Sequence, residues 1–207
     1  MSSAKSGLQH TSRSRQTESA NQKRAQIVES AAALFDQVGY YPTSMDDIAR
    51  AVDLAKPTLY HYFGGKDAIL LGIHEEFIDL ILSKRRERDE AGGDDISQEL
   101  YEVMFDIFEL MRTHRGHVRV FFEHHRELPE GSHESAAAKR DEYFRLVRRL
   151  FEIGQEKGEL KGDPELSAMA LFGMCNWAYQ WFRPNGRFTT EEVARYFHSL
   201  LLHGIAA

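Results

Sequence analysis

The sequence predicts an all-α protein of about nine helices, with a small amino-terminal helix-turn-helix domain of three helices and a larger helical domain. Apolar residues recur three and four positions apart along most of the 207 residues. Glycine, proline and N-cap residues interrupt these stretches, as is typical of helix ends. No segment has the alternation of a half-buried strand. We place the boundaries at 1–22, 23–66 and 91–207, with a helix over 67–90 linking the two domains.

The first 22 residues differ in composition from the helix that follows. They are rich in Ser, Gln, Thr and Ala and contain too little apolar material to fold alone, so we expect a disordered arm. Such an arm could reach along DNA phosphates, and a plain leader or tail is the alternative. The following helix ends at Gly39, which acts as a left-handed C-cap. Its apolar face consists of Ile27, Ala31, Leu34, Phe35 and Val38.

Residues 43–66 are typical of two short helices joined by a tight turn. We expect the first to begin near Thr43, whose side chain would cap it together with Asp46, and to end at Asp53, which tolerates a left-handed backbone. Its apolar face consists of Met45, Ile48, Ala49 and Val52. Pro57 suits the first turn of the second helix, where a missing N–H costs nothing. A second helix held against a first in this way can enter a DNA groove.

The second short helix has two faces. Leu59 and Phe63, four residues apart, turn toward the core. Lys56, Thr58, His61 and Tyr62 are left outside.

At this point the chain resembles the TetR-type repressors. Their amino-terminal pattern of a helix, a threonine ahead of Ile-Ala, a turn, and L-Y-x-Y/H-F-x-x-K extends over residues 22–75. Two positions depart from it, because Asp53 replaces the usual turn glycine and Ala55 the usual capping serine. The matching residues are Thr43, Ile48, Ala49, Leu59, Tyr60, Tyr62, Phe63 and Lys66.

The resemblance implies that some residues of the motif contact DNA phosphates and others approach the bases. Hydroxyls, backbone amides and a lysine suit phosphate oxygens, whereas only a few side chains reach base edges. Tyr60 is open between a DNA contact and a core aromatic, and a core role is the alternative for Tyr62. By resemblance, Thr43, Ser44, Tyr62 and Lys66 contact phosphates, and Lys56, Pro57, Thr58 and His61 approach the major groove.

Charge and cysteine content limit the remaining classes. Residues 1–66 hold four lysines and four arginines against six acidic residues, whereas the whole chain has a net charge of −6. Any nucleic-acid contact is therefore expected at the amino end. One cysteine excludes an internal disulfide, and we interpret Cys175 as a buried hydrophobe. Without a secretion signal the chain is expected in the cytoplasm, and the uncharged run 166–182 fits a buried helix better than a membrane span.

The larger domain repeats the helical pattern in order. The helix over 67–90 is followed by one from the glycines at 92 and 93 to Gly116, a short one over 117–127, and a long one over 134–157. Asp163 and Pro164 open the next helix, and Thr189 with Glu192 forms a capping box for the last. The run 166–182 is apolar almost all round, so it must be covered on more than one side.

A second subunit would provide that cover, and the alternative is that the helix is only the core of its own domain. Two helices from each subunit would form a four-helix interface, and a twofold dimer would suit palindromic DNA operators. The residues assigned to the interface are Phe172, Trp181, Tyr196, Phe197, Leu200 and Leu201.

Aromatic and methionine residues of the larger domain would line an apolar pocket, although spacing alone favours a solid core. The resemblance implies a small hydrophobic inducer there. The stretch 177–193 also resembles repressors that answer to acyl-CoA thioesters of fatty-acid and sterol-ring breakdown. The candidate pocket residues are Met104, Phe105, Phe108, Met111, Phe121, Phe122, Met174 and Trp177. Candidate partners for CoA phosphates are Arg112, Arg115, Arg119, Arg145, Arg148 and Arg149.

Two rival classes compete with a ligand-responsive repressor. A helical metalloenzyme would need two Glu-x-x-His pairs, and Glu130 with His133 is the single match, in a Gly/Ser loop. Because nucleophile motifs and glycine-rich phosphate loops are also missing, we expect no enzyme, metal or cofactor. The other rival is a ligand-independent DNA-binding or interaction module, which would have a filled core.

Overall fold

The computed structural model describes residues 4–128, 131 and 133–205, and within these ranges it contains nine α-helices and no strand. The all-α prediction is confirmed. The helices are α1 (Ala4–Gln37), α2 (Met45–Ala51), α3 (Lys56–Tyr62), α4 (Lys66–Ala91), α5 (Ile96–Thr113), α6 (Arg115–Glu123), α7 (His133–Glu156), α8 (Pro164–Asn176) and α9 (Thr190–Ile205). Short 3-10 turns follow α6 at His125–Glu127 and α8 at Trp177–Gln180.

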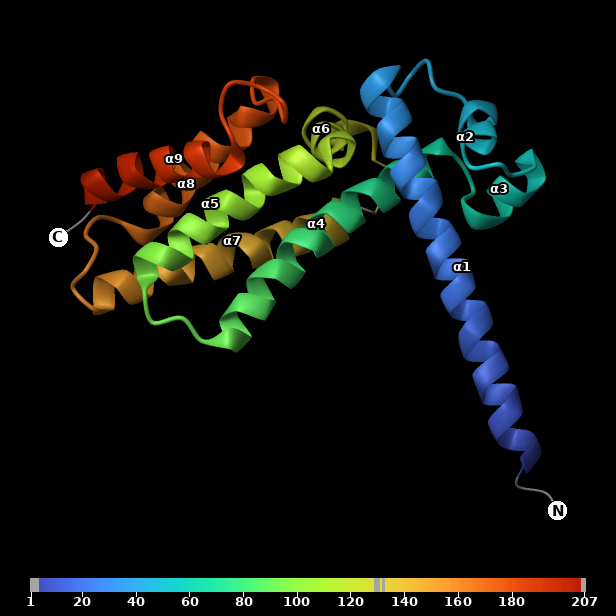
Figure 1. Ribbon diagram of the computed structural model, residues 1–207, viewed down its shortest axis with the longest axis horizontal. Coiled ribbons are helices and arrows are strands. Elements are labelled where there is room, and N and C mark those ends of the chain that lie inside the picture. The colour runs from blue at the N-terminus through green and yellow to red at the C-terminus, as the bar shows by residue number, and fades with distance from the viewer. Residues whose placement is uncertain (1–3, 129–130, 132, 206–207) are drawn as a thin grey trace.

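The helices form two groups that α4 connects (Figure 1). The carboxy-terminal part of α1 lies with α2 and α3 at one end, and α4 runs from there beside α7 into the larger group. The amino-terminal half of α1 projects away from both groups. The structure is helical from Ala4 onward, so the disorder expected for residues 1–22 is not what it shows for 4–22.

The small core of the amino-terminal group uses the predicted apolar faces. Ile27 of α1, Ile48 of α2 and Leu59 of α3 are fully buried together. Val38 was expected on the same face but is 55% exposed. The backbone N–H of Val38 still bonds to the Leu34 carbonyl at 2.8 Å, but α1 ends at Gln37 and Gly39 turns the chain with a φ of +100°, so Val38 lies at the exposed end of the helix.

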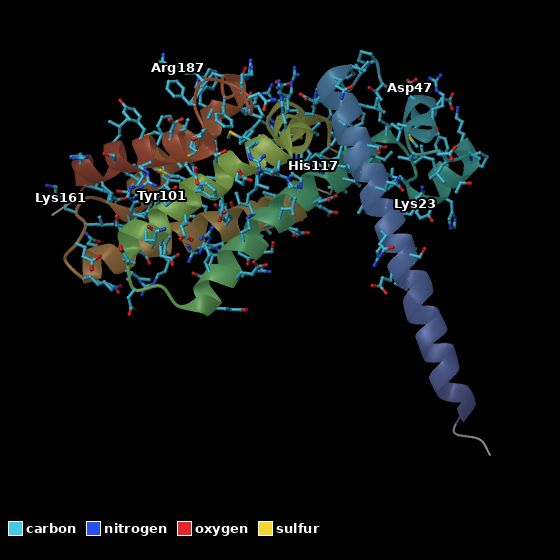
Figure 2. The ribbon with its side chains drawn as sticks, in the orientation of Figure 1. Lys23, Asp47, Tyr101, His117, Lys161 and Arg187 are labelled. Carbon is cyan, nitrogen blue, oxygen red and sulfur yellow. The ribbon has the colours of Figure 1, made fainter. Side chains whose placement is uncertain are left out.

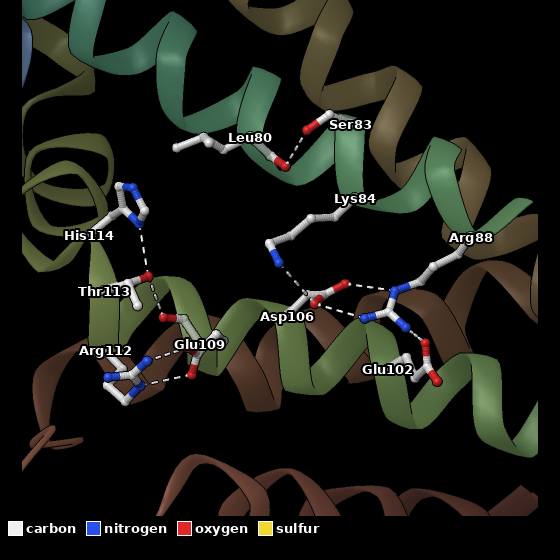
Figure 3. A network of polar contacts seen from close by, with 10 residues as sticks. All are labelled: Leu80, Ser83, Lys84, Arg88, Glu102, Asp106, Glu109, Arg112, Thr113 and His114. Carbon is white, nitrogen blue, oxygen red and sulfur yellow. Dashed lines mark hydrogen bonds and ion pairs between the residues drawn. The ribbon is translucent and has the colours of Figure 1, made fainter. Parts of the chain in front are cut away.

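A polar network fixes the far end of α4 to α5 (Figure 3). The Arg88 guanidinium donates through Nε and Nη2 to the two carboxylate oxygens of Asp106, at 3.1 and 3.0 Å. Lys84 Nζ lies 3.6 Å from the same carboxylate, whose side chain is only 5% exposed. Next to them, Arg85 Nη1 lies 2.6 Å from Glu99 Oε2. Charged groups thus bind α4 to α5, and Asp106, Arg85 and Glu99 are nearly buried there, whereas Lys84 and Arg88 remain partly exposed.

The larger core lies between α5, α7, α8 and α9. Phe108, Leu171 and Val147 are fully buried there. Cys175 is buried beside them, as expected, and burial raises the pKa of its thiol above the usual value. No helix in the described ranges is long and apolar enough to cross a bilayer.

Candidate functional site

The start of α2 is capped one residue later than the sequence predicted. Ser44, not Thr43, is the N-cap: its Oγ accepts from the backbone N–H of Asp47 at 3.2 Å. The Asp47 carboxylate accepts in return from the Ser44 backbone N–H at 2.9 Å. Hydrogen bonds from Ser44 lower the pKa of the Asp47 carboxyl. This capping box fixes the first turn of α2. Ser44 is exposed at the surface of the amino-terminal group formed by the end of α1, α2 and α3, which we call the head.

Thr43 is placed differently from its predicted role. Its side chain is buried, and its hydroxyl donates to the carbonyl of Gly39 at 2.7 Å. That bond closes the turn between α1 and α2. The expectation that the Thr43 hydroxyl contacts phosphate was therefore wrong for this structure.

The helix α3 presents its predicted outer face. Asp53 adopts the left-handed backbone (φ 51°) that the turn requires, and Ala55 supplies no side-chain cap, both as expected. Tyr62 is half-buried against the head core. Lys56 Nζ lies 2.9 Å from Asp46 Oδ1 on α2. The exposed residues of α3 are Lys56, Pro57, Thr58, Tyr60 and His61.

Two basic residues of α1 that the sequence patterns did not single out hold this motif in place. Lys23 Nζ donates to the carbonyl of Val52, the C-cap of α2, at 3.2 Å. Arg24 donates to the carbonyl of Tyr62 at the end of α3, and its guanidinium lies 4.2 Å from the centre of the Phe63 ring. Cations at helix carboxyl ends are favourable. Both groups are thereby engaged within the head.

Lys66 is also engaged internally, contrary to its predicted contact with phosphate. Its Nζ donates to the carbonyls of Tyr40 at 2.8 Å, Tyr41 at 3.3 Å and Thr43 at 3.0 Å, and it lies 4.4 Å from the centre of the Tyr40 ring. Partial burial lowers the pKa of the ammonium group. All three hydrogens of the ammonium group have acceptors, so Lys66 ties the α1–α2 connection to the start of α4.

The larger domain contains a small apolar cavity of about 60 Å³ between α4, α5, α6, α7 and α8. Of the predicted pocket residues, Met111, Phe121 and Phe122 line it. Met104 and Phe108 are buried in the core without lining it, and Phe105 and Met174 pack half-buried around that core. Trp177 is 66% exposed, so its assignment to the pocket was wrong. It lies in the 3-10 turn after α8, which points the indole outward.

A second, cationic pocket of about 170 Å³ lies against the apolar cavity. Arg115, Arg119 and Arg183 line it together with one acid, Glu123, so its lining is net positive. It shares Met111 and Val118 with the cavity. Two of the predicted phosphate partners are therefore brought together, and Arg183 was missed because it lies in a loop after α8. The remaining candidates lie elsewhere: Arg112, Arg148 and Arg149 pair with glutamates of their own helices, and Arg145 bonds to the carbonyl of Asp141.

An exposed apolar face covers parts of α8 and α9. Trp181, Tyr196 and Leu200 of the predicted interface are 41%, 64% and 52% exposed. Phe197 is half-buried and lies with Trp181 and Tyr196 at an apolar groove of about 520 Å³.

Two residues predicted for that interface were placed on the wrong side. Phe172 lines the apolar cavity and packs on Tyr143, with ring centroids 5.5 Å apart, and Leu201 is buried in the core. Three other large apolar residues of α8 and the turn after it are exposed, namely Leu166, Met169 and Trp177.

The helix-turn-helix head joined by α4 to a helical domain with a pocket defines a class, the DNA-binding transcriptional regulators. Residues 27–73 match the model of the bacterial regulatory proteins of the tetR family, and residues 93–205 match the tetracyclin repressor-like C-terminal domain. The chain belongs to the TetR family. It is a transcriptional regulator of the tetracyclin-repressor type and not an enzyme.

Individual relatives agree along most of the chain. The HTH-type transcriptional repressor KstR2 of Rhodococcus jostii (strain RHA1) is 27% identical over 188 residues, which are 89% of this chain and 92% of the relative. The structure of the TetR family regulator PfmR from Thermus thermophilus superposes with a TM-score of 0.80 at 30% identity, covering 86% of this chain and 97% of that one. AibR, solved with isovaleryl coenzyme A and operator DNA, gives 0.77 at 27% identity, covering 87% and 98%.

Proposed function

We propose that this protein is a homodimeric repressor that binds a palindromic operator and leaves it when an acyl-CoA thioester, a small hydrophobic inducer, enters the larger domain. One observation carries the ligand class: the arginine-lined pocket and the apolar cavity share Met111 and Val118 as walls. A CoA thioester needs this combination, since its phosphates are anionic and its acyl group is apolar.

The head supports the DNA part of the proposal. The helix α3 is held at its end by Arg24 and has a solvent-facing side of polar and aromatic residues. We propose that Lys56, Thr58 and His61 approach base edges while Ser44 and Tyr62 meet phosphates. Because chromosomal operators lie in the cytoplasm, this activity would place the protein there.

The exposed apolar face supports the dimer. Soluble monomers rarely expose several large apolar side chains side by side, and a second copy of the same face would cover Trp181, Tyr196 and Leu200. Gly173 of α8 is exposed between Met169 and Trp177 and has open space at its Cβ position. A partner helix could therefore approach α8 closely at this point.

The size of the cavity determines how an inducer would enter. A volume of about 60 Å³ is far below the roughly 300 Å³ or more of typical ligand pockets, so an inducer would have to enlarge this cavity. Phe122 borders the cavity and Tyr179 borders the cationic pocket, and their rings stack with centroids 4.9 Å apart. Parting these two rings would join the two spaces. The relative AibR, with its bound isovaleryl coenzyme A, supports a short acyl chain as a first candidate.

Thermal unfolding against a panel of acyl-CoA thioesters tests the ligand. A ligand at 100 times its dissociation constant adds roughly 2.7 kcal/mol to stability. The same compounds should release a duplex selected from a random pool, and free coenzyme A should do so less well because it lacks the acyl group. If no thioester shifts unfolding while the duplex still binds, the ligand-independent module is the better interpretation.

A substitution pair tests the head. Replacing Thr58 or His61 by Ala should change the sequence that a random pool yields, with losses of about 1–3 kcal/mol at the affected positions. Replacing Ser19 by Ala, on an exposed turn of α1 outside the motif, is the matched control and should leave the selected sequence unchanged. Uniform losses on every sequence would contradict base contacts by α3.

A further inference from the structure

The last turn of α1 carries an acid at the end of the helix where acids are unfavourable. Asp36 lies one residue before the end of α1, and that turn contains no basic residue to offset the negative end of the helix dipole. Compensation comes from the larger domain: Arg119 Nη1 of α6 donates to the Asp36 carbonyl at 3.1 Å and to its Oδ1 at 3.2 Å. Arg115 Nε lies 3.6 Å from Oδ2. The end of α1 is therefore capped by the other domain.

The two arginines that cap α1 also line the cationic pocket. Their side chains are 46% and 43% exposed, so they remain accessible from solvent. Arg119 shares its Nε with Glu123 at 3.1 and 3.2 Å, which leaves Asp36 as the partner from the DNA-binding head. A phosphorylated ligand in this pocket would meet arginines that already hold a carboxylate.

We propose that Arg115 and Arg119 exchange partners, binding Asp36 in the DNA-competent state and the pyrophosphate-type group of a ligand in the released state. This inference rests on the proposed function, because it specifies how a ligand bound in the same pocket changes the contacts between the two domains. A guanidinium offers a planar fork that fits phosphate oxygens as well as carboxylate. When the ligand takes that fork, Asp36 is left unpaired at the negative end of α1.

The contacts around Asp36 carry this change toward the recognition helix. Three residues beyond it, Gly39 starts the turn that Thr43 closes by a hydrogen bond, and α2 begins directly afterward. On the other side of Asp36, Gly116 of α6 sits so close to α1 that a Cβ there would lie 2.5 Å from the Ala32 carbonyl oxygen. His117 beside it (labelled in Figure 2) is buried, with its ring nitrogens 3.7 Å from a carboxylate oxygen of Glu29 on α1 and 3.9 Å from one of Glu76 on α4. A shift of the end of α1 thus moves the base of the head.

Competition for one pair of arginines predicts reciprocal effects. Removing the Asp36 charge should free Arg115 and Arg119, which strengthens anion binding. It should also uncouple that binding from DNA affinity, because the two ligands then no longer compete for the same groups. The predicted change lies within the roughly 5- to 150-fold range of typical coupling between sites.

Inorganic pyrophosphate is the probe, measured by calorimetry on the full-length protein. Asp36→Asn should tighten its binding about tenfold, and Asp79→Asn, which removes an exposed acid of α4 paired with Lys139, should leave it unchanged. Arg119→Gln should weaken it about tenfold or more. If that variant does not fold, Arg183→Gln tests the pocket instead, since the Arg183 guanidinium donates to the nearby carbonyls of Gln180 and Phe182.

The outcomes separate this inference from the proposed function. Equal pyrophosphate affinity in the original protein and in Asp36→Asn, or no pyrophosphate binding at all, overturns the exchange even if acyl-CoA thioesters release DNA. Tighter binding in Asp36→Asn, with the ratio of operator affinities with and without pyrophosphate moving toward one, supports it. That second result would stand even if every thioester in the panel failed.

Discussion

Two contacts join the head and its linking helix α4 to the larger domain, and both pair an aspartate with arginine but differ in burial. At the far end of α4, the Asp106 side chain is only 5% exposed where Arg88 and Lys84 hold it. Where α1 meets α6, the Asp36 side chain is 19% exposed, and it is held by arginines that are nearly half exposed and line a pocket. A buried ion pair is strongly destabilised when one partner is lost, whereas an exposed one can exchange partners at little cost. The first junction therefore acts as an anchor and the second as a replaceable contact.

The anchor gives the largest expected effect. Replacing Asp106 by Ala removes two charge-assisted hydrogen bonds from Arg88 and the ion pair with Lys84. Because both cations are partly exposed and Arg88 keeps Glu102 as a partner, we expect a loss of about 3 kcal/mol of unfolding free energy. For a chain of this size that is roughly 10 °C in melting temperature, measurable by circular dichroism.

The matched control for the anchor is Glu142→Ala. It removes the partner of Arg86, an exposed arginine of α4, and solvent screening of that pair should make the loss much smaller than for Asp106→Ala. Equal losses from the two variants would show that the Arg88–Asp106 junction is not special.

A buried histidine at the near end of α4 gives the next effect. His74 is 1% exposed against Phe121 of α6, and burial first, then the nearby Arg140, lowers its pKa to about 4. Because the unfolded chain takes up this proton at higher pH than the folded chain does, stability should fall as pH drops from about 6.5 toward 4. The loss is on the order of 3 kcal/mol at most, from about 1.4 kcal/mol per pKa unit.

Replacing His74 by Leu checks this assignment. The variant should flatten the stability profile between pH 6.5 and 4, measured by urea unfolding at each pH. His203→Leu changes a histidine that is exposed near the end of α9 and should keep the original slope. A slope that survives in His74→Leu would assign the pH dependence to other groups.

Close packing of α6 on α1 gives a smaller effect on stability with a larger consequence for DNA. Gly116→Ala puts a methyl group against the Ala32 carbonyl, so α1 and α6 must separate, at a cost of about 1–3 kcal/mol. We expect weaker operator binding in gel-shift titrations even without ligand. Gly204→Ala, a helical glycine with no atom within 4 Å of the added Cβ, should bind DNA normally. Normal binding by Gly116→Ala would remove the α1–α6 contact from the mechanism.

The sequence predicted the helices of the head better than the contacts that join the head to the larger domain. The spacing of Ile48, Ala49, Leu59 and Phe63 is local and decides which side of each short helix is buried, and the structure agrees. The cap of α2 was displaced by one residue, since Thr43 and Ser44 are both competent caps and only the turn shows that the Thr43 hydroxyl is already bonded.

Contacts between residues far apart in the chain could not be predicted from the sequence. Because the run 166–182 is apolar on every side, periodicity could not tell that Phe172 faces the cavity while Trp177 faces outward. Partners of charged residues are equally hidden, as the carbonyls that hold Lys66 lie 23 to 26 positions away in the chain. Asp36 likewise shows no sign in sequence that its partners are on α6.

Lys66 gives the smallest and sharpest test, because the sequence and the structure disagree about it. Since its ammonium group is bonded to three carbonyls, Lys66→Met should lower unfolding free energy by about 1 kcal/mol and weaken operator binding through a looser head, without changing the salt dependence. A direct phosphate contact would instead reduce the slope of log K against log salt by about 0.9. Lys56→Met, at an exposed lysine of α3, is the comparison. If Lys66→Met reduces the slope of log K against log salt and Lys56→Met does not, then Lys66 leaves its carbonyls on binding DNA and the start of α4 moves with it.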